Sequence, residues 1–430
     1  MAALPRSDGD RAALLARFDA VRATTEALVA PLSPEDQQVQ SMADASPAKW
    51  HRAHATWFFE TFVLAPHLAG YRPFDARYGF LFNSYYEAIG PRHARPDRGL
   101  LTRPSAADVG AFRAHVDGAM KRLVETAPDA AWSAVAPPLE LGLHHEQQHQ
   151  ELLLTDIKHA FAANPLKPAY ATDLRPNNGA AAAPLRWHDV GGGLAEIGHD
   201  GNDFAFDNES PRHRVWLEDF AVASRPVTNG EYLAFIEDGG YDRPGHWLSD
   251  GWATVQRESW KAPLYWERRD GTWRDFTLRG ERPLEPSSPV CHLSYYEADA
   301  FARWAGARLP TEAEWEHAAR SFPPPDEADC NLLAAGRLHP APSSDAGHGR
   351  PAQMIGDVWE WTGSAYAPYP GFHPAAGAVG EYNGKFMANQ LTLRGGSCVT
   401  PPGHVRITYR NFFYPHQRWQ FTGLRLARDA

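Results

Sequence analysis

The chain has little of what marks exported, membrane-bound or nucleic-acid-binding proteins. Its three cysteines, at positions 291, 330 and 398, are too scattered for a disulfide framework or a zinc knuckle. No apolar run approaches the ~18 residues of a membrane span, and the first residues lack the apolar core of a signal peptide. A net charge of -10 without a basic block disfavours nucleic acid and anionic membranes as partners. We therefore expect a soluble, cytoplasmic protein.

The 430 residues have a globular composition, and their first part has helical periodicity. Capping candidates precede apolar residues at helical spacing, and no fixed-period repeat occurs. Four amphipathic helices predict an N-terminal bundle over residues 1–165, whose core could hold a metal. The connection 67–103 is too long for a simple turn, and such loops are often functional. The expected helices cover residues 7–32, 46–68, 105–127 and 139–163.

The rest of the chain has a different residue composition. Residues 166–186 are rich in Pro, Asn and Ala, which is typical of an interdomain linker. From 187 to 430, Gly, Trp, Pro and Asp punctuate short segments, and only "SYYEADAFARWAG" and "TEAEWEHAAR" are convincing helices. The expected fold class is therefore α + (α+β): a helical bundle followed by an irregular α+β domain with many loops.

The segment "LHHEQQHQELLL" contains the letters of the zinc-protease motif H-E-x-x-H. On a helix, His145 and His149 lie one turn apart on one face and can bind one metal ion together. A zinc hydrolase would use Glu146 as general base and needs a third ligand farther along. The chain has Leu152 and Thr155 where the metzincin extension needs Gly and His. A zinc hydrolase is therefore a disfavoured alternative.

An earlier helix offers a third imidazole. In "SPAKWHRAHATWFFETF", His54 shares a helical stripe with Trp50 and Trp57, whereas His51 shares one with Phe58. Periodicity does not separate the two histidines, and a lone histidine on an apolar face is more often a hydrogen-bonded core residue. Three imidazoles without a carboxylate would suit Fe, Cu, Ni or Zn and would leave coordination positions open.

Several segments together resemble a known family. "SPAKWHRAHATWFFETFVL", "FNSYYEAIGPRHARPDRG" and "HHEQQHQELLLTDIKH" are similar to the DinB-like bundle of the ergothioneine-pathway sulfoxide synthases (EgtB). "PVTNGEYLAFIEDGGY", "ARLPTEAEWEHAAR", "GDVWEWTGSAY", "LRGGSC" and "RNFFYPHQRWQFTGLRLARD" resemble their second domain, which is related to the formylglycine-generating enzyme and C-type lectin folds. These matches span nearly the whole chain in the family's order.

The resemblance implies a mononuclear non-haem iron(II) centre and no organic cofactor. Its ligands would be His54, His145 and His149, while His51 and His144 would not bind the metal. The implied reaction uses dioxygen to join a thiol sulfur to imidazole C2 of hercynine (Nα-trimethylhistidine) and to oxidise that sulfur. The implied partners are therefore small molecules: hercynine, and cysteine or γ-glutamylcysteine. The local sequence around these motifs is closer to that of the subgroup that uses cysteine.

Two adjacent tyrosines in the long loop are candidate proton donors. Oxygen chemistry at a metal needs a proton source, and a phenol held by packing can supply it. The family carries a catalytic tyrosine, which one subgroup supplies from this loop, so we favour Tyr86 and then Tyr85. Two half-buried aromatic residues without a catalytic role are the alternative.

Six further residues are candidates for substrate binding. Gln148, between the ligand histidines, could hydrogen-bond the substrate imidazole, and Asn411 corresponds to a family position that contacts hercynine. Phe412 stands where some relatives have Trp, and aromatic rings suit a trimethylammonium group. Arginine pairs with carboxylates through two hydrogen bonds, so the loop arginines could bind the thiol's carboxylate, unless they only form an exposed basic loop. These arginines are Arg92, Arg95 and Arg98.

One departure concerns the second domain. Formylglycine-generating enzymes use a cysteine pair, but after Cys398 the chain has no further cysteine. We therefore expect this domain to act as a substrate-binding wall, with both halves needed for activity. An ovothiol-type synthase acting on histidine and a ligand-binding module with lectin-like loops remain alternatives.

Overall fold

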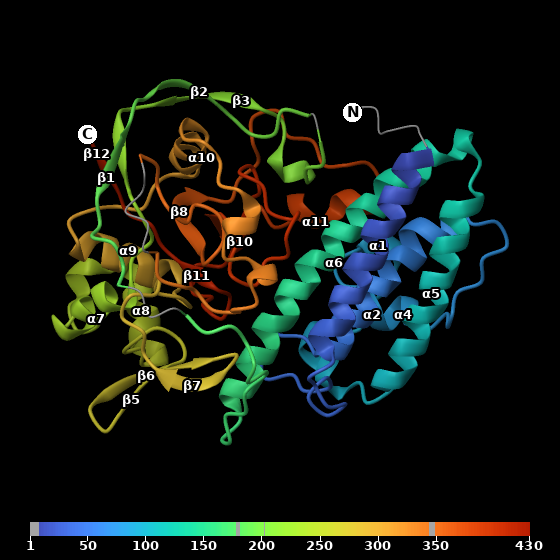
Figure 1. The fold of residues 1–430 in the computed structure, drawn as a ribbon, viewed down its shortest axis with the longest axis horizontal. Helices are drawn as coiled ribbons and strands as arrows, with labels where there is room; N and C mark the ends of the chain where they lie inside the picture. Colours follow the sequence, from blue (N-terminus) through green and yellow to red (C-terminus); the bar gives the residue numbers. More distant parts are fainter. Residues whose placement is uncertain (1–7, 178–180, 202, 344–348) are drawn as a thin grey trace. The chain divides into compact units, whose positions relative to one another are not determined.

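The computed structural model describes residues 8–177, 181–201, 203–343 and 349–430, so part of the expected linker (178–180) lies outside the described residues. The chain forms two compact units. Unit 1 comprises Met1–Leu166 together with two short segments of later sequence, Gly201–Phe204 and Ala376–Tyr382. Unit 2 comprises the remainder of the chain. The helical part and the strand-rich part are drawn in Figure 1.

Unit 1 contains the expected four-helix bundle. Its long helices are α1 (Asp8–Val29), α2 (Ala48–Phe59), α5 (Ala106–Thr126) and α6 (Asp129–Ala163). α2 runs on through a π-helical turn (Glu60–Leu64) into the short α3 (Ala65–His67). The core between the helices is rich in aromatic side chains, including Trp50, Trp57 and Phe112. Burial of this apolar surface is the main term that holds the bundle together.

The fourth helix is longer than the sequence predicted. α6 begins at Asp129 rather than near Leu139, and it continues through Pro137 and Pro138. Each proline removes one backbone donor, and such interior prolines are normally unfavourable. Leu139 and Leu143, which follow the prolines, are fully buried in the bundle core. This packing stabilises the helix across the proline pair.

The connection between α3 and α5 is structured. It contains α4 (Tyr78–Phe82) and two 3-10 turns, Glu87–Ile89 and Arg95–Leu100. Asn83 holds the first part of the loop, because its amide donates to the carbonyls of Tyr86 and Gly90. The loop residues that carry the candidate tyrosines and arginines are therefore fixed by hydrogen bonds within the loop.

Unit 2 is built from small sheets with helices between them. A four-stranded sheet has the order β10-β9-β8-β11, with β9 antiparallel to β8 and β10 and with β11 parallel to β8. The other sheets have the orders β1-β4-β12, β5-β6-β7 and β2-β3. The strands are β1 (Trp187–Val190), β2 (Gly193–Ile197), β3 (His213–Leu217), β4 (Phe220–Ala223), β5 (Trp266–Arg269), β6 (Thr272–Thr277), β7 (Gly280–Pro283), β8 (Trp359–Ala365), β9 (Leu391–Arg394), β10 (Asn411–Phe413), β11 (Thr422–Gly423) and β12 (Ala427–Asp429).

The two helices predicted in this part are confirmed as α9 (Tyr295–Trp304) and α10 (Glu312–Ser321). Two further helices, α7 (Asn229–Glu237) and α8 (Ser249–Glu258), were not predicted from the sequence. A signal for α7 was present: Thr228 and Glu231 form a capping box at its start. The short α11 (Glu381–Gly384) begins at the end of the segment that belongs to unit 1.

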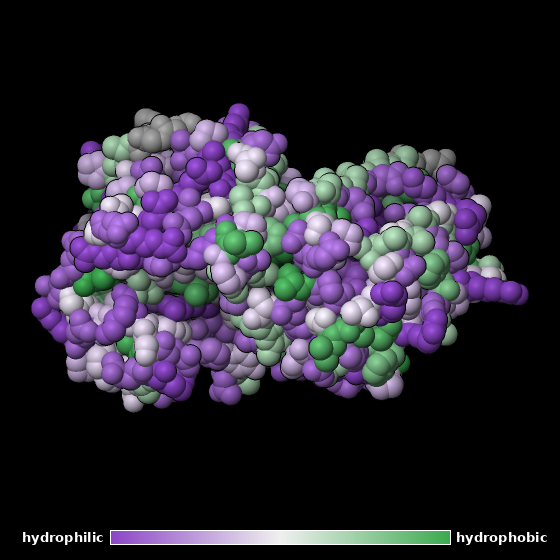
Figure 2. All heavy atoms as spheres, turned by 90° about the horizontal axis from the view of Figure 1, so that it is seen from below, coloured by the Kyte–Doolittle hydropathy of each residue, from purple (hydrophilic) through white to green (hydrophobic). Residues whose placement is uncertain are grey.

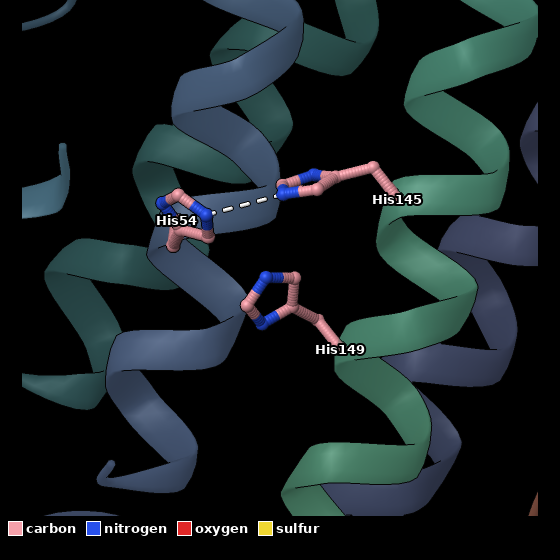
Figure 3. A group of neighbouring side chains, drawn as sticks. All are labelled: His54, His145 and His149. Atoms are coloured by element: carbon pink, nitrogen blue, oxygen red, sulfur yellow. Dashed lines mark hydrogen bonds between the residues drawn. The ribbon is translucent and has the colours of Figure 1, made fainter. Parts of the chain in front are cut away.

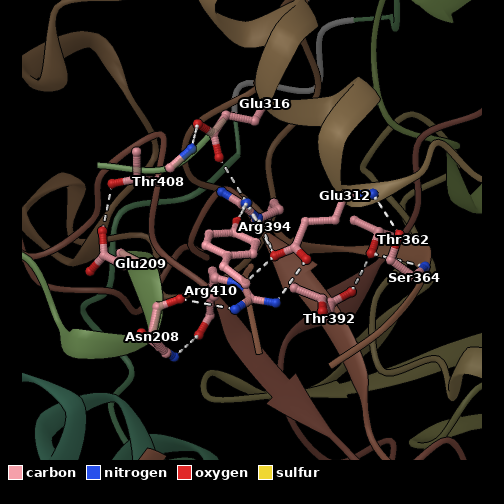
Figure 4. A network of polar contacts seen from close by, with 12 residues as sticks. Asn208, Glu209, Glu312, Glu316, Thr362, Ser364, Thr392, Arg394, Thr408 and Arg410 are labelled. Carbon is pink, nitrogen blue, oxygen red and sulfur yellow. Dashed lines mark hydrogen bonds and ion pairs between the residues drawn. The ribbon is translucent and has the colours of Figure 1, made fainter. Parts of the chain in front are cut away.

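Buried ion pairs tie α10 to the four-stranded sheet of unit 2 (Figure 4). The guanidinium of Arg394 lies 2.9 Å from Glu316 and 3.1 Å from Glu312, and Arg410 lies 2.7 Å from Glu312. These side chains are almost completely buried, so each charge depends on its partner. The network fixes Arg410, the residue that precedes β10.

The face drawn in Figure 2 mixes hydrophilic and hydrophobic side chains. Among the residues that the structure describes, no helix is both long and apolar enough to cross a bilayer.

Candidate metal and substrate site

Three histidines meet inside the bundle of unit 1. His54 comes from α2, and His145 and His149 come from successive turns of α6, so that the rings face one another between the two helices (Figure 3). One nitrogen from each ring lies within 4.8 Å of the others, and the Nε2 atoms of His54 and His145 are 3.2 Å apart. Ring nitrogens this close can share one cation.

The three imidazoles are held in the neutral form that metal binding requires. Burial lowers the pKa of His145 to about 3, and burial with the neighbouring histidines lowers the pKa of His54 and His149 well below the usual value. His54 donates its Nδ1 hydrogen to the carbonyl of Phe82 at 2.5 Å, which leaves the Nε2 lone pair for a metal. Among described residues, buried His145 Nδ1 has no hydrogen-bond partner. The donor set therefore fits a transition-metal ion.

Glu146, the residue that a zinc hydrolase would use as base, is engaged elsewhere. Its carboxylate is fully buried and accepts hydrogen bonds from Arg22 at 2.9 Å, Arg113 at 3.0 Å and Thr25 at 2.6 Å. Burial raises its pKa, but the charges of Arg22 and Arg113 outweigh burial and bring the pKa to about 2. A carboxylate that two arginines neutralise is a poor general base. This arrangement argues against the hydrolase alternative.

His51 and His144, the neighbouring histidines in the same two helices, bond to other side chains of the protein. His51 contacts His149 Nδ1 through its own Nδ1 at 2.8 Å, and its Nε2 lies 3.0 Å from the carboxylate of Asp156. His144 Nε2 lies 2.7 Å from Arg17, and its ring stacks on Phe204. Among the described residues, neither His51 nor His144 belongs to the group of three histidines that could share a metal ion.

Aromatic rings surround the three histidines. The rings of Trp50 and Trp57 both stack with that of His54, with ring centroids 4.5 and 5.5 Å from it. Phe58 stacks on His145 at 4.6 Å. These rings fix the imidazoles and reduce the access of water to this side of the site.

Tyr86 lies one ring away from this cluster. Its ring is 5.7 Å from Trp57 and 5.1 Å from Phe62, and only 3% of its surface is exposed. The backbone N–H and carbonyl of Tyr86 bond to the side chain of Asn83. Its hydroxyl makes no hydrogen bond to any residue that the structure describes. Burial raises the pKa of Tyr86, with a further contribution from Tyr382 and Glu381. The phenol is therefore protonated at neutral pH.

Tyr85 has a different environment. It is half-buried, and its hydroxyl accepts a hydrogen bond from Arg95 at 2.7 Å. Its ring lies 6.0 Å from that of Tyr382, a residue that was not a candidate in the sequence. The two loop tyrosines are thus distinct: one hydroxyl is bound by an arginine, and the other has no such partner among the described residues.

The three loop arginines also differ. Arg92 is exposed and pairs with Glu87 at 3.0 Å. Arg98 is only 4% exposed, donates to the hydroxyls of Ser46 and Ser84, and lies 3.4 Å from the ring centre of Trp50. Among described residues it pairs with no carboxylate, and its Nε has no hydrogen-bond partner. Burial, with the charge of Arg95, lowers the pKa of Arg98 to about 9. Within the described chain, Arg98 is thus a buried cation without a counter-ion.

The segment Ala376–Tyr382, from the second half of the sequence, contacts the loop that carries Tyr85 and Tyr86. The carboxylate of Glu381 accepts the backbone N–H groups of Glu87 and Ala88, each at 3.0 Å. The residues on either side of this segment bond to Asp207 of unit 2. The backbone N–H of Ala375 and the side-chain amide of Asn383 both donate to its carboxylate. Glu381 was not a candidate in the sequence, since no local pattern connects it with residues so far away.

The remaining candidates occupy two places. Gln148 lies on α6 between the two histidines and is half-buried. Asn411 and Phe412 belong to unit 2, on β10, where Phe412 stacks on Tyr366 at 4.1 Å. Asn411 accepts a hydrogen bond from the backbone N–H of Phe412 at 2.9 Å.

Comparisons with known families agree with this division. Residues 17–153 match the DinB superfamily, and residues 188–332 and 334–430 match the sulfatase-modifying factor enzyme 1-like domain. The fold and the three-histidine site thus define a two-part protein in which a DinB-type bundle carries a candidate metal centre.

Curated relatives match across both parts. Hercynine oxygenase from Mycolicibacterium smegmatis is 35% identical over 367 residues, which cover 80% of this chain and 83% of that protein. Hercynine oxygenase from Mycobacterium tuberculosis is 35% identical, covering 80% and 82%. The formylglycine-generating enzyme of Streptomyces coelicolor is 28% identical and covers 54% of this chain and 84% of its own. The chain belongs to the hercynine oxygenase family and is an oxidoreductase, which confirms the resemblance seen in the sequence.

Proposed function

We propose that this protein is an O2-dependent, iron(II)-dependent sulfoxide synthase of ergothioneine biosynthesis. It joins a thiol, cysteine in preference to γ-glutamylcysteine, to imidazole C2 of hercynine and oxidises the sulfur. The observation that carries the proposal is the group of three neutral imidazoles, two buried and one partly buried, in a member of the hercynine oxygenase family. The proposed substrates are small molecules, and no organic cofactor takes part.

His54, His145 and His149 would hold the iron. Iron(II) bound there would supply the activation of dioxygen and of the thiol sulfur, since three protein ligands leave positions open to both. The rings of Trp50, Trp57 and Phe58 keep the imidazoles in place.

Tyr86 is the proposed proton donor. Its phenol keeps its proton at neutral pH, and no described protein group uses its hydroxyl. Proton transfer needs the donor within hydrogen-bond reach of the reacting group, a distance that packing against Trp57 and Phe62 would set. Tyr85 is the second candidate, and its hydroxyl stays close to the guanidinium of Arg95.

Arg98 is the proposed binding group for the carboxylate of the thiol. A buried guanidinium without a counter-ion gains more from a substrate carboxylate than an exposed one does. Arg95, which also lacks a carboxylate partner among described residues, could assist it. Arg92 is the weakest of the three candidates, because Glu87 already neutralises it.

Hercynine is the proposed partner of Gln148, Asn411 and Phe412. The amide of Gln148 can hydrogen-bond the imidazole, and that of Asn411 can bind the polar end of the substrate. The ring of Phe412 suits the trimethylammonium group. Since Asn411 and Phe412 belong to unit 2, this assignment requires both halves of the chain for activity.

One assay tests the proposed function. The metal-free protein is loaded with Fe(II) without oxygen, mixed in air with hercynine and cysteine, and the product is analysed by mass spectrometry. We expect the cysteine–hercynine sulfoxide, and none from the His145→Ala variant. Parallel reactions replace cysteine with γ-glutamylcysteine and hercynine with histidine. Sulfoxide formation only with histidine would show an ovothiol-type synthase, and the absence of sulfoxide in all reactions would contradict the proposal.

A further inference from the structure

His51 lies between a proposed metal ligand and a buried carboxylate. It precedes His54 by one turn of α2, and Asp156 follows His149 by two turns of α6. His51 Nε2 is 3.0 Å from Asp156 Oδ2, and His51 Nδ1 is 2.8 Å from His149 Nδ1. His51 is 3% exposed and Asp156 5%, so the link between these two residues is shielded from solvent, while His149 is partly buried.

The chemistry of the groups sets the direction of these hydrogen bonds. An ionised carboxylate only accepts, so His51 donates its Nε2 hydrogen to Asp156. A neutral His51 then has a lone pair on Nδ1, which accepts the Nδ1 hydrogen of His149. With its hydrogen on Nδ1, His149 has its lone pair on Nε2, and this nitrogen is left to bind a metal.

We propose that Asp156 and His51 are positioning residues that orient His149 as a metal ligand and strengthen its donor nitrogen. Metal-bound histidines commonly donate their other N–H to a carboxylate or a carbonyl, which fixes tautomer and ring orientation. Here an additional histidine extends the reach of the carboxylate. The inference rests on the proposed function only in taking the three-histidine group as the metal site.

Asp156 couples this chain to the position of α2. Its Oδ2 also accepts the backbone N–H of Ser46, at 2.8 Å, just before α2 begins. One carboxylate therefore fixes both the start of the helix that carries His54 and the ring of His51. The two ligands on different helices, His54 and His149, share this anchor.

Metal affinity in a graded set of variants tests the proposal without turnover. His51→Leu removes both hydrogen bonds, whereas Asp156→Asn keeps an acceptor oxygen for His51 and Ser46 and removes the charge. The matched control is His144→Gln, a buried histidine of α6 whose partners are Arg17 and Phe204. For each variant, the dissociation constant of Fe(II) is measured without oxygen, together with the absorption spectrum of the Co(II) form.

We expect His51→Leu to weaken Fe(II) binding roughly 10- to 100-fold, as for other outer partners of ligand histidines, and to change the Co(II) spectrum. Asp156→Asn should have a smaller effect of the same kind, and His144→Gln none. Because the groups act in series, the double variant should bind no more weakly than His51→Leu.

Wild-type affinity and spectrum in His51→Leu would overturn the proposal, as would additive losses in the double variant. Failure of the protein to bind either metal would overturn it as well. If the wild-type protein binds Fe(II) but forms no sulfoxide, the proposed function fails and the positioning role stands.

Discussion

Arg98, a buried arginine of unit 1, differs in its surroundings from three buried arginines of unit 2. In unit 2, Arg394 lies 2.9 Å from Glu316, Arg410 lies 2.7 Å from Glu312, and Arg425 lies 2.8 Å from Glu360. In unit 1, Arg98 is similarly inaccessible, but its described partners are two serine hydroxyls and the ring of Trp50. The first three arginines have their counter-ions within the described chain, and Arg98 does not.

Two buried tyrosines of unit 2 differ from Tyr86 in the same way. Tyr241 donates to Glu297 at 2.7 Å, and the hydroxyl of Tyr369 accepts from Arg394 at 3.0 Å, both within unit 2. In unit 1, the hydroxyl of Tyr86 has no hydrogen bond to any described residue. Unit 1 is not generally unpaired, since Glu146 binds two arginines.

We propose that this difference separates structural from functional polar groups. A buried charge or hydroxyl without a partner costs free energy, so such groups are rare unless a ligand completes them. In unit 2, the buried arginines and glutamates pair with one another and hold α10 to the sheet. In unit 1, Tyr86 packs against Trp57 and Arg98 against Trp50, and both of these rings stack with His54. The following variants test this distinction.

The largest effect is expected at Tyr86. Tyr86→Phe keeps the ring and removes only the proton, so sulfoxide formation should fall by roughly 10²–10⁴, the usual range for a lost general acid. Oxidation of the thiol alone to a sulfinic acid should increase. Mass spectrometry of the products measures both. Unchanged product ratios in Tyr86→Phe and Tyr85→Phe would assign both residues to packing.

Arg394→Met should lower the free energy of unfolding by about 3–5 kcal/mol, because it removes the fully buried cation that pairs with both Glu316 and Glu312. Denaturant-induced unfolding measures this change. A loss below about 1 kcal/mol, the value of a surface ion pair, would show that the network is not structural.

Arg98→Met is the matched variant in unit 1. It removes a cation without a counter-ion, so the free energy of unfolding should stay the same or rise. The kcat/KM for the thiol should fall roughly 10- to 100-fold, which corresponds to losing a hydrogen bond to a charged group. Strong destabilisation with normal use of the thiol would reverse the roles given to the two arginines.

Low pH should weaken the ion pairs that Glu312 makes with Arg394 and Arg410 in unit 2. Burial raises the pKa of Glu312, but the charges of Arg410 and Arg394 outweigh it and lower the pKa below the ordinary value of 4.5. The stabilisation is therefore complete above about pH 4.5 and is lost as the pH falls through the folded pKa. Each tenfold reduction in the proton affinity of this carboxylate corresponds to about 1.4 kcal/mol. Unfolding free energies measured at falling pH should decline more steeply for the wild type than for Glu312→Gln, and equal slopes would contradict this.

The part of the candidate site that depends on local spacing could be predicted from the sequence. His145 and His149 lie one turn apart in any helix, and the four helices follow from capping and periodicity. The choice between His51 and His54 could not be made in this way, because every residue of α2 is buried and no polar face marks its outside. The structure shows instead that His51 binds His149 and Asp156.

Other features depend on contacts between distant residues. The role of Glu381 at the tyrosine loop requires two segments far apart in the sequence to meet. The difference between Arg92 and Arg98 is a difference of burial and pairing, which equal spacing in the sequence conceals.

The central claim is that His54, His145 and His149 hold one iron ion. The most direct measurement is the iron content per chain after anaerobic loading and removal of free metal, in the wild type and in His54→Ala, His145→Ala, His149→Ala and His144→Ala. We predict one iron per chain in the wild type and in His144→Ala, and almost none in the other three. Full iron content in any of those three would contradict the claim.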